Sequence, residues 1–233
     1  MHATASAPGP ESASSPMGHR EAIGRVVGAY HDPLVRAYSW GRFKIFRQRF
    51  LEEIGQYLPE RGRVLDIGCG FGLFALYYAQ RSRGRSILGV DLSEGRIATA
   101  RRAAADLGLD NARFAISDAR GIAKLDPFDA VYVLDVLHHV PREVVPGLIR
   151  AVHAALPMGG VFVVKDLDTQ PAWQRVFAHA LDLAMSPSSP PHYWAQDELA
   201  AELARAGFSV KRHVLIDYLP YPHVLFVATK SRA

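Results

Sequence analysis

The hydrophobic positions of the chain follow helical spacing first and then shift to short β-type runs alternating with helices. In the first helical stretch, apolar residues recur every three or four positions and basic residues lie between them. These apolar residues are Phe43, Phe46, Phe50, Ile54 and Leu58. We predict one amphipathic helix here, ended by the proline and glycine of residues 59–62.

Beyond this helix, strand and helix patterns take turns along the chain. The predicted strands are residues 64–67, 86–90, 112–116, 130–134 and 161–164. Helices are expected after Gly72, over residues 93–107 and over residues 142–156. Short strands that alternate with helices indicate a parallel sheet, so the pattern predicts a doubly wound α/β fold with helices on both faces.

The end of the chain departs from this alternation. After a helical pattern at 196–206, two β-rich runs at 208–216 and 223–229 are separated only by residues 217–222. A parallel pair needs a crossover of roughly a dozen residues or more. The final two strands are therefore predicted to form an antiparallel hairpin on an otherwise parallel sheet.

Composition suggests one globular domain with a short appendage. The chain has 233 residues, of which 49% are hydrophobic, enough for one sizeable core. Residues 1–19, rich in Ala, Ser, Pro and Gly, are expected to form a disordered tail. We expect residues 20–60 to form a helical cap, and residues 61–233 the main domain with a lid insert at 168–194. No secretory signal or membrane-spanning run is evident, so a cytoplasmic protein is expected.

Three alternate glycines follow the first strand of this domain. The run from Val64 to Gly72 reads Val-Leu-Asp-Ile-Gly-Cys-Gly-Phe-Gly, and it places Gly68, Gly70 and Gly72 at a strand-to-helix junction. Glycines at such a junction allow a tight turn and close approach of a nucleotide-type ligand. Cys69, the one cysteine, excludes an internal disulfide or a cysteine-based zinc site and is expected to be a buried packing residue.

Further motifs follow at fixed places in the predicted fold. They are Gly-Val-Asp-Leu-Ser at 89–93, Ser-Asp-Ala at 117–119, Phe-Asp-Ala-Val-Tyr-Val at 128–133 and Leu-His-His-Val at 137–140. With the glycine run, over roughly residues 60–230, the chain resembles the class I S-adenosylmethionine-dependent methyltransferases. The resemblance implies a seven-stranded sheet, S-adenosylmethionine as the cofactor and methyl transfer as the activity.

The alternative for the glycine loop is a nicotinamide or flavin site. That fingerprint requires a third glycine where this chain has Leu73. Asp66 would also repel a diphosphate, whereas it suits a ligand that carries an ammonium and a sulfonium. Charge therefore favours S-adenosylmethionine over a dinucleotide, and a cofactor-binding scaffold without catalysis is the other alternative.

Several residues at the strand ends are candidates for cofactor binding. Asp91 ends the second strand, where a carboxylate can accept both ribose hydroxyls, and Ser93 can cap the next helix in its place. By resemblance, Asp118 with Ala119 forms the adenine-binding turn, for which a plain turn aspartate is the alternative. The full expected set is Asp66, Gly68, Cys69, Gly70, Gly72, Asp91, Leu92, Asp118, Ala119 and Asp135. Asp129, before the fourth strand, is expected to be structural.

Candidate catalytic residues follow the fourth and fifth strands. His138 and His139 could take a proton from an acceptor, and the resemblance favours His138 as the residue that faces substrate. A structural histidine is the alternative for either residue, and for His139 it is the preferred one. Asp166 is the second candidate base. An ion-paired or capping role for Asp166 and for Asp168 is the equal alternative, and Lys165 is a candidate to neutralise a neighbour. No metal is expected at this site.

The expected acceptor is a small aromatic or lipidic molecule, polyketides included, methylated on oxygen or carbon. Aromatic residues in two segments could cover it and exclude water. In the N-terminal segment these are Tyr30, Tyr38, Trp40, Phe43 and Phe46, and in the insert they include Trp173, Phe177, Tyr193 and Trp194.

The net charge of +4 comes largely from residues 20–49, where seven basic residues face two acidic ones. We interpret this excess as a solvated helix face, with weak membrane-surface contact through residues 42–49 as an alternative. Nucleic acid is not expected as a partner. Base methylases resemble one another in an Asn/Asp-Pro-Pro-aromatic element, where this chain has Leu-Asp-Val-Leu at 134–137.

Overall fold

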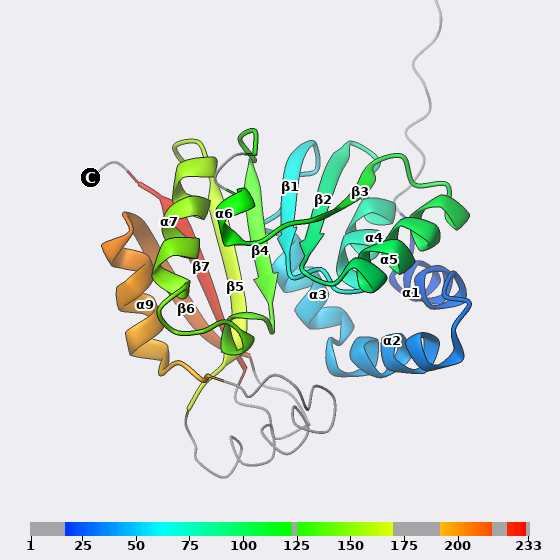
Figure 1. Ribbon diagram of the computed structural model, residues 1–233, viewed down its shortest axis with the longest axis horizontal. Helices are drawn as coiled ribbons and strands as arrows, with labels where there is room; N and C mark the ends of the chain where they lie inside the picture. The colour runs from blue at the N-terminus through cyan, green and yellow to red at the C-terminus, as the bar shows by residue number, and fades with distance from the viewer. Residues whose placement is uncertain (1–16, 123–124, 170–191, 216–222, 232–233) are drawn as a thin grey trace, which may run out of the picture.

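The computed structural model describes residues 17–122, 125–169, 192–215 and 223–231. Its centre is one seven-stranded sheet with helices packed on both faces (Figure 1). The strands lie in the order β3-β2-β1-β4-β5-β7-β6. The predicted fold class is confirmed.

The five parallel strands lie close to their predicted positions. They are β1 (Gly62–Ile67), β2 (Arg85–Asp91), β3 (Ala112–Ile116), β4 (Ala130–Leu134) and β5 (Val161–Leu167). β1 pairs in parallel with β2 on one side and with β4 on the other. The strand order therefore reverses between β1 and β4, which in open α/β sheets is the place where ligands bind.

The last two strands form the predicted antiparallel hairpin. β6 (Phe208–Leu215) pairs antiparallel with β7 (His223–Lys230), and β7 pairs antiparallel with β5. β7 thus lies between β5 and β6, and β6 forms the edge of the sheet.

Each face of the sheet packs against its own set of helices. One core cluster joins β-strand residues such as Val64 and Tyr132 to α1 (His19–Gly28), α2 (Pro33–Ile45), α3 (Gln48–Gly55), α4 (Leu73–Arg81) and α5 (Glu94–Asp106). The other joins Leu65 and Val133 to α6 (Ala119–Ile122), α7 (Val145–Ala155) and α9 (Gln196–Arg205). Successive strand residues point to opposite faces, so both clusters come from the same strands.

The helix predicted between Phe43 and Leu58 is two helices, so this prediction is wrong in its continuity. α2 ends at Ile45, Phe46 leaves helical geometry at φ −83° and ψ 79°, and α3 begins at Gln48. The break lets Phe46 become fully buried with its ring 4.6 Å from that of Phe74. The five periodic apolar residues are nevertheless all buried, as the pattern predicts.

One predicted domain boundary shifts in the structure, and another lies where the structure gives no description. The tail was expected to reach His19, yet that residue begins α1 and contacts the Tyr77 hydroxyl at 2.9 Å, so the prediction is wrong at this end. The expected lid insert at 168–194 falls largely outside the described residues. Among the helices that the structure does describe, none has the length and apolar character needed to cross a bilayer.

Candidate functional site

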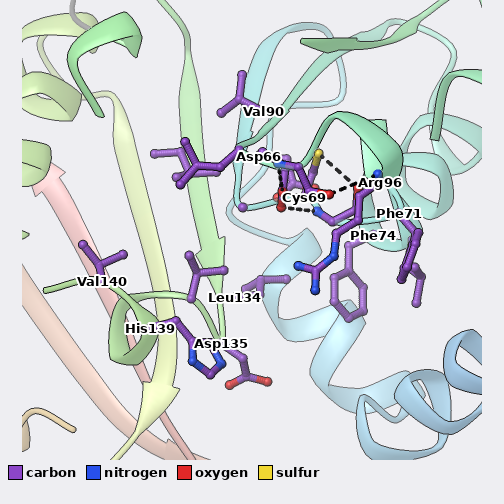
Figure 2. Close-up of a pocket in the computed structure, with 18 of the residues that line it drawn as sticks. Asp66, Cys69, Phe71, Phe74, Val90, Arg96, Leu134, Asp135, His139 and Val140 are labelled. Atoms are coloured by element: carbon purple, nitrogen blue, oxygen red, sulfur yellow. Dashed lines mark hydrogen bonds between the residues drawn. The ribbon is translucent and has the colours of Figure 1, made fainter. Parts of the chain in front are cut away.

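A pocket of about 840 Å³ opens at the carboxyl ends of the parallel strands, where the segments that follow β1 and β4 leave toward opposite faces of the sheet. The glycine loop, the ends of β2 and β4, the short helix η1 (Leu137–His139) and one side of α2 form its wall. Figure 2 shows Phe71, Phe74 and Arg96 on one side of this space and Leu134, His139 and Val140 on the other. Apolar side chains with a few charged groups are typical of small-molecule sites of this size.

The glycine loop has a conformation that side chains would obstruct. Gly68, Gly70 and Gly72 have φ values of 72°, 55° and 82°, in the left-handed region. A Cβ at Gly68 would lie 2.5 Å from Val136, and one at Gly72 would lie 2.8 Å from Phe114. Around Gly70, by contrast, a Cβ would meet open space, and this residue lines the pocket. Gly68 and Gly72 thus serve the packing of the loop, whereas Gly70 lets a ligand approach the main chain.

Asp91 connects the glycine loop to the end of β2. Its carboxylate accepts hydrogen bonds from Gly70 N at 3.0 Å and from Ser93 N at 2.9 Å. Ser93 is the N-cap of α5 and accepts from Arg96 N, so the predicted cap is confirmed. Asp91 lines the pocket and can still accept hydrogen bonds from a ligand, because each carboxylate oxygen can accept more than one hydrogen bond. Leu92 beside it lines the same wall.

Asp66 lies at the floor of the pocket and is almost fully buried. Burial raises the pKa of Asp66 to about 7, an effect that the 2.9 Å hydrogen bond from the Tyr132 hydroxyl opposes and the charge of Asp91 reinforces. The carboxyl group is therefore poised to ionise when a positive charge arrives next to it. Cys69 is buried as predicted, and burial raises the pKa of its thiol.

Asp118 lines the outer part of the pocket, next to Ala119 at the start of α6. Its carboxylate accepts from Gly121 N at 2.9 Å, which is the turn role that the sequence left as an alternative. A position on the pocket wall and a turn contact are compatible, because one oxygen suffices for the turn.

Asp135 lies on the pocket wall but is held by two cations. Its carboxylate forms ion pairs with Arg42 of α2, at 3.0 Å, and with Lys165 of β5. Burial alone would raise the pKa of Asp135, but Lys165 and then Arg42 outweigh it and hold the pKa well below its ordinary value. The predicted role of Lys165 as a neutralising partner is confirmed. Asp135 also has a φ of 55°, unusual for a residue other than glycine.

The same cluster attaches α2 to the sheet through an aromatic ring. The Arg42 guanidinium lies 4.8 Å and the Lys165 ammonium 4.7 Å from the centroid of Phe46. Burial lowers the pKa of Lys165, while Asp135 opposes this. His223 also lines the pocket, and burial, followed by the charge of Lys165, lowers its pKa to about 2, so this imidazole is neutral.

The two expected catalytic groups His138 and Asp166 form one buried pair. Asp166 contacts the Nδ1 atom of His138 and accepts from His138 N at 3.1 Å. Asp166 lies behind the histidine at the end of β5, and His138 itself lines the pocket. His139 also lines the pocket, with its ring 4.2 Å from that of His138. Tyr193 stacks on His138 at 5.7 Å.

Two other carboxylates have the structural roles that the sequence allows. Asp168 accepts hydrogen bonds from the backbone and side-chain nitrogens of Gln196, at 3.2 and 2.9 Å, and so joins the end of β5 to the start of α9. Asp129 accepts from Arg63 N at 2.7 Å, which confirms its structural role.

The aromatic residues of the N-terminal segment do not all face the pocket. Tyr38 lines it, whereas Phe43 and Phe46 belong to the core below. The buried Tyr30 donates from its hydroxyl to Phe71 O at 2.9 Å and so supports the glycine loop. Trp40 projects to the surface, with 57% of its area exposed.

Sequence reasoning missed several residues of the pocket wall. They include Arg42, Phe74, Arg96, Val144 and His223. Local patterns give no signal for Arg42 or His223, because they reach the pocket only through the packing of α2 and β7 on the sheet. Arg96 was foreseeable, since it follows Ser93 by one helical turn.

The chain belongs to the family described as "Methyltransferase domain", whose model matches residues 41–213. The fold and the pocket at the β1 and β4 ends already place it among α/β proteins with a strand-end ligand site. The match includes the last residues of α2, the glycine loop and the histidines of η1.

Two curated relatives match about half of the chain. A trans-aconitate 2-methyltransferase from Variovorax paradoxus is 36% identical over 48% of this chain and 41% of its own length. A ubiquinone biosynthesis O-methyltransferase from Pseudomonas aeruginosa is 35% identical over 47% of this chain and 46% of its own length. The chain thus spans less than half the length of either relative.

Solved structures show the same fold. The structure of an S-adenosylmethionine-dependent methyltransferase from Methanosarcina mazei superposes with a TM-score of 0.62, at 22% identity, over 78% of this chain and 98% of that one. At this level of identity the similarity supports the architecture alone.

Proposed function

We propose that the protein transfers a methyl group from S-adenosylmethionine to a small aromatic or lipidic acceptor, on oxygen or carbon. One observation carries the proposal: a cofactor-sized loop site and an apolar acceptor space with a buried histidine and aspartate pair share one pocket. S-adenosylmethionine, when bound, supplies an electrophilic methyl group on sulfur.

The residues of the loop side fit this cofactor. Gly70 leaves the main chain open to a ligand, and Asp91 offers acceptors suited to ribose hydroxyls. Asp66 can become the negative partner of an ammonium group. Leu92 and Ile122 provide apolar surface near Asp118, where an adenine ring is expected to lie.

The acceptor side has the groups needed to align a nucleophile and to remove its proton. Leu134, Val140 and Val144 form apolar wall that excludes water. In the tautomer in which Nδ1 of His138 donates to Asp166, Nε2 is the ring nitrogen that accepts the proton of the acceptor. His138 is thus the proposed general base and Asp166 its positioning residue. The O-methyltransferase among the relatives supports oxygen as the methylated atom.

Calorimetry and product release test this proposal. We expect the full-length protein to bind S-adenosylmethionine and not NADH, and to release S-adenosylhomocysteine with acceptors from a panel of phenols, quinols and acyl-chain acids. His138→Gln should lower kcat about 100-fold with unchanged cofactor affinity, since general base catalysis contributes roughly 10²–10⁴-fold.

His139→Gln is the matched control, because it changes the neighbouring ring of the same η1 turn, which does not contact Asp166 in the described hydrogen bonds. An equal loss in both variants would remove His138 as the base. NADH binding without S-adenosylmethionine binding would overturn the proposal. Cofactor binding without product from any acceptor would favour a non-catalytic scaffold.

A further inference from the structure

α2 has a second, outward surface, most of which lies outside the pocket. One side of this helix lines the pocket through Val35, Tyr38 and Arg42. The outward side, which we call the outer face of α2, consists of Leu34, Ala37, Trp40, Gly41 and Lys44, and Leu34 lies at the border that this face shares with the pocket. Figure 1 shows α2 along the outer edge of the molecule, at the end of the sheet where β4 and β5 finish.

The outer face of α2 exposes large apolar side chains. Leu34 is 80% exposed and Trp40 57% exposed, and the small residues Ala37 and Gly41 lie between them on the helix. Helix α2 does not need these side chains for its own packing, because it buries Ser39 and Phe43 on its other side. Large apolar side chains beside small residues are typical of a surface that is exposed to solvent in the free protein and covered by an apolar partner on binding.

The charges around this face have one sign. From Pro33 to Leu51 the chain has five basic residues and no acidic residue. Of these, Arg36, Lys44, Arg47 and Arg49 are exposed, while Arg42 points into the pocket.

The flanking carboxylates are engaged within their own helices. Asp32 caps α2 by accepting from Leu34 N, and Glu52 accepts from Gln48. A strip of apolar residues bordered by cations, without opposing acids along this stretch, complements an anionic lipid surface.

The mouth of the pocket continues this apolar surface. Leu34 and Leu92 line the pocket and are 80% and 74% exposed, and the exposed Val144 also lines it. An acyl chain or ring system that entered between these side chains would pass from an apolar surface into the apolar pocket. The rim is thus built for transfer of a lipidic molecule without full hydration.

We propose that the outer face of α2 docks on anionic membranes and places the pocket mouth at the lipid surface. This inference rests on the proposed function for the identity of the incoming molecule, but the docking itself is independent of catalysis. The membrane interaction suggested by the sequence for residues 42–49 is relocated, because Phe43, Phe46 and Phe50 are buried core residues. The bilayer contact instead involves the outer face of α2, which extends from Leu34 to Lys44.

Vesicle sedimentation of the full-length protein tests the proposal. We expect binding to phosphatidylcholine vesicles that contain 30% phosphatidylglycerol, much weaker binding to phosphatidylcholine alone, and loss of binding at high salt. Lys44→Glu should weaken binding at least 10-fold, because it replaces an attractive charge with a repulsive one. Trp40→Ala should weaken it by a similar factor.

Matched controls lie on surfaces remote from α2. Lys211→Glu makes the same charge change on β6, and Met158→Ala removes an exposed apolar side chain between α7 and β5. Both should bind anionic vesicles as the unchanged protein does. An absence of binding to anionic vesicles, or equal losses in Lys211→Glu and Lys44→Glu, would overturn the proposal.

Two further measurements separate the alternatives. Sedimentation velocity that shows a dimer dissociated by Trp40→Ala, without vesicle binding, would assign the face to a second copy and overturn the membrane proposal. Calorimetry with S-adenosylmethionine in the absence of vesicles reports separately on the proposed function. Trp40→Ala and Lys44→Glu should leave that cofactor affinity unchanged.

Discussion

At the scale of single residues, Asp66 links ligand binding to protonation. Its folded pKa of about 7 exceeds the value near 4 expected in the unfolded chain. The folded protein therefore keeps a proton that the unfolded chain loses, so this group's contribution to stability falls as pH rises from about 4 to about 7.

We predict that S-adenosylmethionine binding at pH 6 releases up to one proton from Asp66. An ammonium group near the carboxyl favours its ionised form, against the burial that raises the pKa in the free protein. Calorimetry in two buffers of different ionisation enthalpy measures the release. Asp66→Asn keeps an acceptor for the Tyr132 hydroxyl and should abolish it. Identical apparent enthalpies for the unchanged protein in both buffers would refute the linkage.

A second residue-scale prediction compares two glycines of the same loop. Gly72→Ala should destabilise the fold by about 2–4 kcal/mol, because a positive φ and a Cβ 2.8 Å from Phe114 both oppose it. Gly70→Ala should cost only about 1–2 kcal/mol of stability from its φ. It should instead lower cofactor affinity, because its methyl group enters the pocket. Urea unfolding and calorimetry measure the two effects, and an unchanged affinity for Gly70→Ala would contradict the assignment of the loop.

At the scale of elements, the contact between α2 and the sheet depends on the Arg42, Asp135 and Lys165 cluster. A buried ion pair adds little stability relative to apolar groups, but removing one partner leaves an uncompensated charge. Removing one partner therefore costs much more stability than the intact ion pair contributes. Substitutions in this cluster thus report sensitively on how α2 is attached to the sheet.

We predict that Lys165→Met destabilises the protein by about 3–5 kcal/mol, because Asp135 then keeps only Arg42 as a charged partner among the described contacts. Adding Asp135→Asn should restore at least half of this loss, since asparagine tolerates the positive φ and is neutral. Urea denaturation of both variants gives the comparison. A double variant less stable than Lys165→Met alone would show that the charge is not the cause.

The elements also show what sequence patterns could and could not predict. Five parallel strands and the final hairpin were predictable, because strand burial and connection length act locally. The break at Phe46 was not, since it depends on the ring of Phe74, a contact made only after α2 and α4 pack together. Helical periodicity continues through the break and hides it.

At the scale of the whole molecule, the site was predictable where it follows the ends of strands. Asp66, Asp91 and the two histidines all lie on the pocket wall, as their positions near the ends of β1 and β2 and after β4 suggest. The ion pairs of Asp135 join residues 93 and 30 positions apart, and the pairing of His138 with Asp166 spans 28. Such long-range contacts arise from topology, so a single sequence shows the groups but not their partners.

The position of β7 has a consequence for the order in which the fold can form. β5 and β6 flank β7 and make no ladder with each other, so β6 has no place in the sheet until residues 223–230 are available. During synthesis, the chain up to β5 can assemble its parallel strands while the ribosome is still producing the rest. The hydrogen-bonding edge of β5 with which β7 will pair is exposed in that interval. The sheet therefore becomes complete only late, after β7, the last of its seven strands in the sequence, has been synthesised.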